Sequence, residues 1–262
     1  MEDRQDRPWK APPINRPRPL LRRKRTWIAA ATVAVIIAVV VFVWGPWRTT
    51  RVTDGGELFA DHLARVQSLI LAENNRVTGS DRPWVSIALM LPIRTTDDPR
   101  NNSQDVLRHL QGAYLAQYWA NHPNGDDKFG NDVPLIRLLL ADTGGDGQKW
   151  QDTVAKLADM AQPKSGEYLV AVAGLGLSTD ATQRAANALA ATGIPMVGTV
   201  ITATGLAAPG LFRVAPTNSD EAAAMINYLR STPDWQSASA TAPYKAYLVQ
   251  DRAEDDTYVE DL

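Results

Sequence analysis

The chain of 262 residues contains no cysteine. This absence excludes disulfides, thiolate metal sites, cysteine catalysis and attachment to a lipid through an N-terminal cysteine. Histidine is scarce as well, and the three residues His62, His109 and His122 share no metal-ligand spacing. The hydrolase motif G-x-S-x-G and the zinc-peptidase motif H-E-x-x-H are both missing. We therefore expect a binding protein rather than an enzyme, with no metal and no cofactor.

Positive charge is concentrated at the N-terminus. Residues 1–26 hold nine Lys and Arg against three acidic residues, a net of +6, whereas residues 48–262 hold 18 against 26, a net of -8. The acidic main part shows no interleaving of basic and aromatic residues, which argues against nucleic acid as a partner. The basic tail also carries five prolines, so we expect it to lack a core and to contact anionic lipid head groups.

An uncharged apolar run lies between these two parts. It covers 27–44, begins with Trp27 and ends with Trp44, and follows the cluster Arg22–Arg25. Eighteen apolar residues are enough to span a bilayer, and the positive-inside rule keeps the tail in the cytoplasm. A cleaved signal peptide is the alternative, but no A-x-A site follows the run. We therefore predict a single-pass membrane anchor with an extracytoplasmic main domain.

The pattern beyond the run alternates between buried strands and amphipathic helices. A helix is expected over 57–74, packed on the domain as a cap. Further helices are predicted over 104–121, 148–161, 179–192 and 219–230, and strands over 84–92, 134–141, 169–173, 194–200, 211–215 and 244–249. This order predicts an α/β fold in which a parallel sheet has helices on both faces.

Two loops at the ends of neighbouring strands contain the candidate binding residues. The first follows Gly174 and Gly176 and contains Ser178, which we expect to cap the next helix; the second is 198–202. A dinucleotide fingerprint is excluded because Thr179 occupies the position of its third glycine. Helix N-termini attract anions and parallel sheets bind ligands at the carboxyl ends of strands, so a ligand carboxylate is expected here.

Taken in order, several segments resemble one family, the type 1 periplasmic binding proteins of the Leu/Ile/Val-type branch, which are the solute receptors of ABC importers. The resemblance runs from about 84 to 262 and rests on VSIALMLP, IRLLLADTGGD, LVAVAGLGLST, IPMVGTVIT, LFRVAPTNSDEAAA and YKAYLVQDRAEDDTYVEDL. It implies two α/β lobes joined by a hinge, with a small polar ligand such as an amino acid bound between them. The partner it implies is an ABC permease, with a membrane signalling protein as the alternative, and the predicted anchor adds the membrane bilayer.

The resemblance also implies the ligand-binding residues. The loop after the third strand of the family corresponds to Ser178 and Thr179, and the loop after the fourth corresponds to Ile201 and Thr202, with Thr199 nearby. Two departures from the family are expected: a helical anchor, and a second lobe present only as its beginning. The resulting parts are a tail (1–26), a transmembrane helix (27–44), a linker with an amphipathic helix (45–83), a first lobe (84–243) and the start of a second lobe (244–262). A ligand-sensing ectodomain of the same fold stays open as the alternative to transport.

Overall fold

The computed structural model describes residues 52–93, 103–122, 134–145, 147, 149–238, 241–245 and 247. Its centre is a sheet of six strands in the order β1-β3-β2-β4-β5-β6. Neighbours from β3 to β6 are parallel, whereas β1 lies antiparallel to β3. The strands are β1 (Val52–Thr53), β2 (Trp84–Leu91), β3 (Leu135–Asp142), β4 (Leu169–Gly174), β5 (Met196–Gly198) and β6 (Leu211–Arg213). The prediction of a wholly parallel sheet is thus corrected to a mixed, mostly parallel one, because a strand of two residues leaves no readable period.

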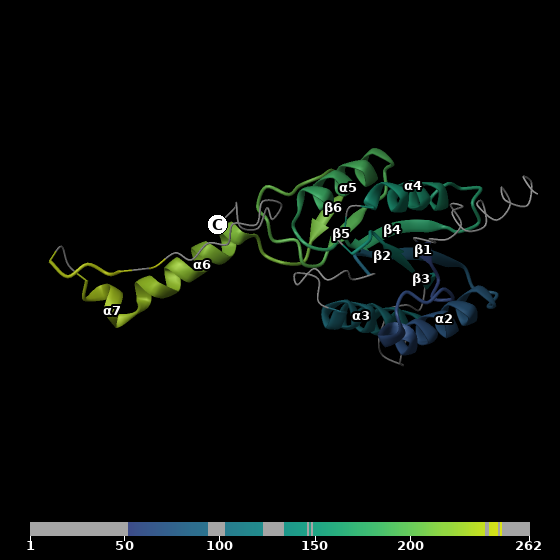
Figure 1. The fold of residues 1–262 in the computed structure, drawn as a ribbon, viewed down its shortest axis with the longest axis horizontal. Helices are drawn as coiled ribbons and strands as arrows, with labels where there is room; N and C mark the ends of the chain where they lie inside the picture. Colours follow the sequence, from purple (N-terminus) through teal and green to yellow (C-terminus); the bar gives the residue numbers. More distant parts are fainter. Residues whose placement is uncertain are drawn as a thin grey trace, which may run out of the picture. The chain divides into compact units, whose positions relative to one another are not determined.

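Helices cover both faces of the sheet, as predicted. Figure 1 shows α2 and α3 on one face and α4 and α5 on the other. The helices are η2 (Asp61–Leu63), α2 (Ala64–Thr78), α3 (Ser103–Asn121), α4 (Trp150–Met160), α5 (Asp180–Ala191), α6 (Asn218–Ser231) and α7 (Pro233–Gln236). The first helix begins later than the predicted 57–74. The reason is that the Gln67 amide accepts a hydrogen bond from the Phe59 N–H and donates one to the Glu57 carbonyl, which holds that segment outside the helix.

Each face of the sheet has its own hydrophobic core. On the α4 and α5 side, Leu157, Leu189 and Met196 are fully buried. On the α2 and α3 side, Ile70 and Leu110 are equally inaccessible. Burying a side chain of this size contributes roughly 1.5–3 kcal/mol, so both cores stabilise one α/β domain.

Two asparagine side chains complete the edge of β3 that β1 leaves uncovered. The Asn74 amide accepts from the Leu138 N–H at 2.9 Å and donates to the Leu138 carbonyl at 2.7 Å. Asn121 repeats this exchange with Ile136, accepting at 2.7 Å and donating at 2.9 Å. An exposed strand edge invites pairing with other chains, and here two amides take the hydrogen-bonding positions of a neighbouring strand.

Several predictions fall outside the described residues. They include the tail at 1–26, the apolar run at 27–44 and half of the strand predicted over 244–249, whose described residues 244, 245 and 247 do not form a strand. Among the helices that the structure describes, none combines the length and the apolar character that a membrane span requires.

Candidate functional site

The strand order places a topological switch point at the carboxyl ends of β2 and β4. The chain passes from β2 to β3 on one side and then crosses back to β4 on the other side of β2. Ligands of open α/β sheets bind in the crevice that this reversal leaves beyond the strand ends. At this edge, β2 leads into Pro92 and Ile93, and β4 leads into the loop from Gly174 to Ser178.

The loop after β4 has an unusual backbone. Gly174, Leu175 and Gly176 have successive φ angles of 98°, 71° and 81°, so three residues in a row are left-handed. A Cβ on Gly174 would lie 2.8 Å from the Met90 carbonyl oxygen, which makes glycine necessary there. The buried side chain of Leu175 and its N–H bond to Met90 O, at 2.8 Å, hold the turn against β2. Residues in sparsely populated conformations cluster at binding sites, and this turn lies at the switch point.

Ser178 joins the two loops that the sequence singled out. Its hydroxyl oxygen accepts hydrogen bonds from the backbone N–H groups of Thr202 and Ala203, both at 3.2 Å, and the side chain is buried. The structure therefore brings Ser178 and Thr202 together, as the common sheet edge predicts. The expectation that Ser178 caps α5 is wrong, because Thr179 is the N-cap and accepts from the Thr182 N–H. The buried Ser178 side chain therefore holds the two loops together.

The other predicted residues differ in how accessible their side chains are to a ligand. Ile201 is fully buried in the core, where its side chain packs on Gly198. The Thr179 hydroxyl is engaged with Thr182, 3.1 Å away. The Thr199 hydroxyl is inaccessible and has no hydrogen-bond partner within the described part of the chain. Thr202 is half-buried, and its backbone is engaged on both sides, by Ser178 and by the Asn218 N–H.

Exposed apolar side chains lie on the same loops and next to β6. Leu177 and Val200, one on each of the two joined loops, expose 45 % and 36 % of their surface. Val214 follows β6, donates its N–H to Gly198 O at 3.2 Å, and is 69 % exposed.

Arg213 is a positioning residue that the sequence did not reveal. Its guanidinium donates to the carbonyls of Ala203, at 2.7 Å, and of Leu206, and so fixes the segment after Thr202 from the end of β6. No local pattern marks such a role, because an arginine that ends a strand is equally suited to solvent. The positive charge of Arg213 therefore lies against carbonyl oxygens of the protein itself.

Asp142 joins the ends of two strands at this edge. Asp142, at the end of β3, is fully buried and accepts from the N–H groups of Ile93 and Gly144, both at 3.0 Å. Its carboxylate thereby ties β3 to β2. Among the described residues, no group of three or more His, Asp or Glu has the arrangement of a metal site.

Comparisons with known proteins identify no family. No protein-family model matches the chain, and a search of curated proteins finds no significant match. What is shown is the α/β domain with its mostly parallel sheet and the geometry of the edge just described.

Proposed function

We propose that this chain is an extracytoplasmic, membrane-anchored solute-binding protein of an ABC-type importer, and that it recognises a small polar ligand such as an amino acid. The observation that carries the proposal is the pair of loops joined by Ser178, which holds the half-buried Thr202 against the loop that follows β4 at the topological switch point. The resemblance of the sequence to type 1 periplasmic binding proteins supports the same conclusion. Binding, not catalysis, is the activity proposed.

The ligand groups follow from the donors and acceptors at the edge. A carboxylate would accept from the hydroxyl of the half-buried Thr202, and an ammonium group would bind the carbonyls of the same loops. An apolar portion would contact Leu177 and Val200, which are otherwise exposed to water. One hydroxyl that donates to a charged group, at about 1.5 kcal/mol or more, together with apolar contact suits a small amphiphilic solute.

The test is ligand-dependent thermal stabilisation of the full chain in a screen of amino acids and related metabolites. Thr202→Val removes only the hydroxyl, since the backbone N–H that Ser178 accepts is kept. We expect this variant to lose at least about tenfold in affinity, and Thr202→Ser to restore most of it. If no metabolite stabilises the chain, or if Thr202→Val responds like the unmodified protein, the proposed site is wrong.

A sensing ectodomain is the second candidate, and the N-terminal sequence favours it. An uncleaved apolar run preceded by a basic tail would give the domain a cytoplasmic segment through which to signal. Uptake of the ligand by cells separates the two functions. Transport is lost on deletion of the gene if the chain serves an importer, and is unchanged if it serves a sensor.

A further inference from the structure

A groove of about 440 Å³ lies between α2 and α3, and it shares no lining residue with the candidate site. Its lining residues recur at helical spacing, with His62, Arg65 and Leu69 on the side of η2 and α2, and Gln111, Tyr114 and Leu115 on α3. Each side thus presents one stripe of side chains to the same hollow. Its volume lies in the range of small-molecule sites, so the groove is large enough for a ligand.

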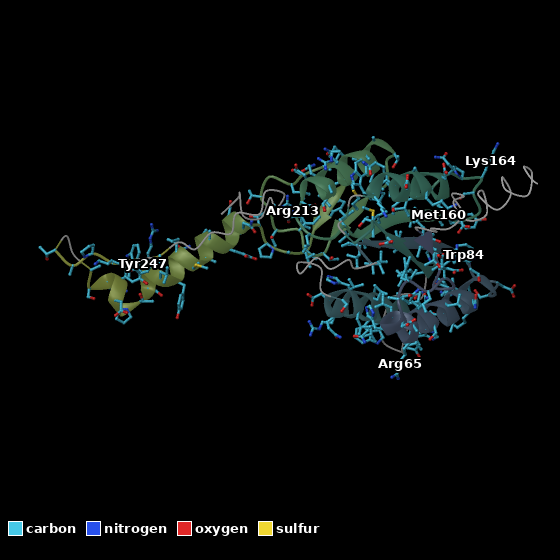
Figure 2. All side chains as sticks on the ribbon, viewed as in Figure 1. Arg65, Trp84, Met160, Lys164, Arg213 and Tyr247 are labelled. Carbon is cyan, nitrogen blue, oxygen red and sulfur yellow. The ribbon has the colours of Figure 1, made fainter. Side chains whose placement is uncertain are left out.

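Three polar side chains of the groove are not engaged by the protein. Within the part of the chain that the structure describes, the side chains of His62, Arg65 and Gln111 form no hydrogen bond and no ion pair. Arg65 points away from the sheet and into solvent (Figure 2). The nearby Asp105 and Arg108, by contrast, pair with each other at 2.9 Å and do not line the groove. Three unpaired polar groups beside one hollow are therefore available to a ligand.

The groove is positively charged although the domain around it is acidic. No Asp or Glu is among its lining residues, and Arg65 supplies a permanent positive charge. Residues 48–262 as a whole hold 18 Lys and Arg against 26 acidic residues. A cation that has no carboxylate partner attracts anions, so the lining favours an anionic ligand over a cationic one.

The groove has a polar end and an apolar end. α2 and α3 run in the same direction, because the groove joins their earlier parts and the Gln117 amide donates to Asn74, at 2.8 Å, between their later parts. Arg65 therefore lies toward the starts of the two helices, where the helix dipoles also favour negative charge. Further along, Leu69 and Leu115 expose 41 % and 47 % of their surface. This order suits a ligand with an anionic head and an apolar body.

We propose that this groove binds a small organic anion with an apolar body, such as an arylalkanoate. Its carboxylate accepts hydrogen bonds from Arg65 and Gln111, and its apolar body lies along Leu69 and Leu115. Hydrogen bonds between ions of opposite charge are about twice as strong as those between neutral groups, so Arg65 sets the preference for an anion. Val66, which is only 3 % exposed, joins the groove to the core on the α2 and α3 side, so the hollow exists before the ligand binds. The site is independent of the one proposed at the carboxyl ends of the strands.

Calorimetric titration of the full chain in lipid nanodiscs tests the proposal, with empty nanodiscs as the blank. The probe is 3-phenylpropanoate, and 3-phenylpropylamine is the matched ligand of similar size and opposite charge. We expect saturable binding of the acid and at least about tenfold weaker binding of the amine, because the amine places a second cation beside Arg65. If the acid shows no saturable binding, as would happen if lipid or a second copy of the chain filled the groove, the proposal is wrong. Equal binding of the two probes overturns it as well.

Two pairs of variants locate the binding in the groove. Arg65→Gln is expected to weaken binding of the acid by about three- to tenfold, whereas Arg184→Gln, which removes an exposed arginine of α5, should have no effect. Leu69→Asn should weaken binding by about the same factor and Leu69→Met should not, since methionine keeps the apolar contact. Thr202→Val should leave binding of the acid unchanged, which separates a failure here from a failure of the proposed solute site. Binding that survives both Arg65→Gln and Leu69→Asn overturns the proposal.

Discussion

Helices α5 and α6 begin alike, yet they lie in different surroundings. Each has a threonine N-cap whose hydroxyl accepts the N–H three residues on, Thr179 from Thr182 and Thr217 from Asp220. Both are rich in alanine and of similar length. However, five side chains of α5 are buried against the sheet, whereas Asn218 is the only buried residue of α6.

The comparison shows that the residues that start and end a helix differ from those that pack it into a core. For α6 the local signals are complete, with a capping box, acidic residues in the first turn and Arg230 in the last. These signals specify helix geometry and satisfy the backbone groups of the helix ends. Burial in α5 comes from the sheet face beneath it, which no capping residue supplies. Stability should therefore depend on the side chains of α5 and much less on those of α6.

The largest expected difference in the free energy of unfolding is between truncating a buried side chain of α5 and truncating an exposed one of α6. Leu189→Ala in α5 removes a fully buried side chain and is expected to lower the free energy of unfolding by about 3 kcal/mol. Met225→Ala in α6, where the side chain is 63 % exposed, should change it by less than about 0.5 kcal/mol. Denaturant unfolding followed by tryptophan fluorescence measures both. Comparable losses would mean that α6 is buried in solution.

The next effect concerns two carboxylates with lowered pKa values. Burial raises the pKa of Glu73, but hydrogen bonds from Arg76, His122 and Asn121 outweigh it and lower the value to about 2. The resulting stability is present above the unfolded-state pKa, near 4.3, and is lost as the pH falls towards 2. Glu73→Gln should therefore cost about 2 kcal/mol at pH 7 and flatten the stability profile between pH 5 and pH 2.

The counterpart in α6 is Asp220, whose pKa is lowered by hydrogen bonds from the Thr217 hydroxyl and backbone N–H. Asp220 is fully exposed, so Asp220→Asn should leave the global acid profile unchanged and affect only the first turn of α6. Acid unfolding curves of the two variants, recorded side by side, test this contrast. A profile that Asp220→Asn flattens as much as Glu73→Gln does would refute it.

The smallest effect concerns the caps. Thr179→Ala is expected to lower the free energy of global unfolding by about 1 kcal/mol, because α5 unfolds with the core. Thr217→Ala removes an equivalent hydrogen bond, but we expect it to speed hydrogen exchange of α6 amides without changing global stability. Exchange measured by mass spectrometry resolves the two helices. Identical behaviour of both variants would show that α6 unfolds together with the sheet.

Apolar periodicity was sufficient to predict β2, β3 and β4, since each is a buried run bounded by turn residues. It also predicted α3, α4 and α5 to within two residues. It could not predict β1, whose two residues form a strand only because β3 offers them an edge. Likewise, Ser178 and Thr179 are both good caps by composition, and the choice between them depends on amides more than 20 residues away.

The candidate site was predictable in position but not in detail. Consecutive strands that end in polar loops indicate a shared edge, and Ser178 and Thr202 do meet there. The engagement of each hydroxyl, the burial of Ile201 and the role of Arg213 depend on contacts between distant segments. Such contacts leave no periodic trace in one sequence.

The asparagines on the edge of β3 have a consequence for the chemical ageing of the protein. Deamidation converts an amide into a carboxylate of nearly the same shape but without its N–H donors. At Asn74 the new oxygen would face the carbonyls of Leu138 and Asp54, and at Asn121 it would face Ile136 O and the carboxylate of Glu73. Repulsion would then release the strand edge that the amides had covered. The loss of one nitrogen atom would expose this part of the β3 edge as a template for pairing with other chains.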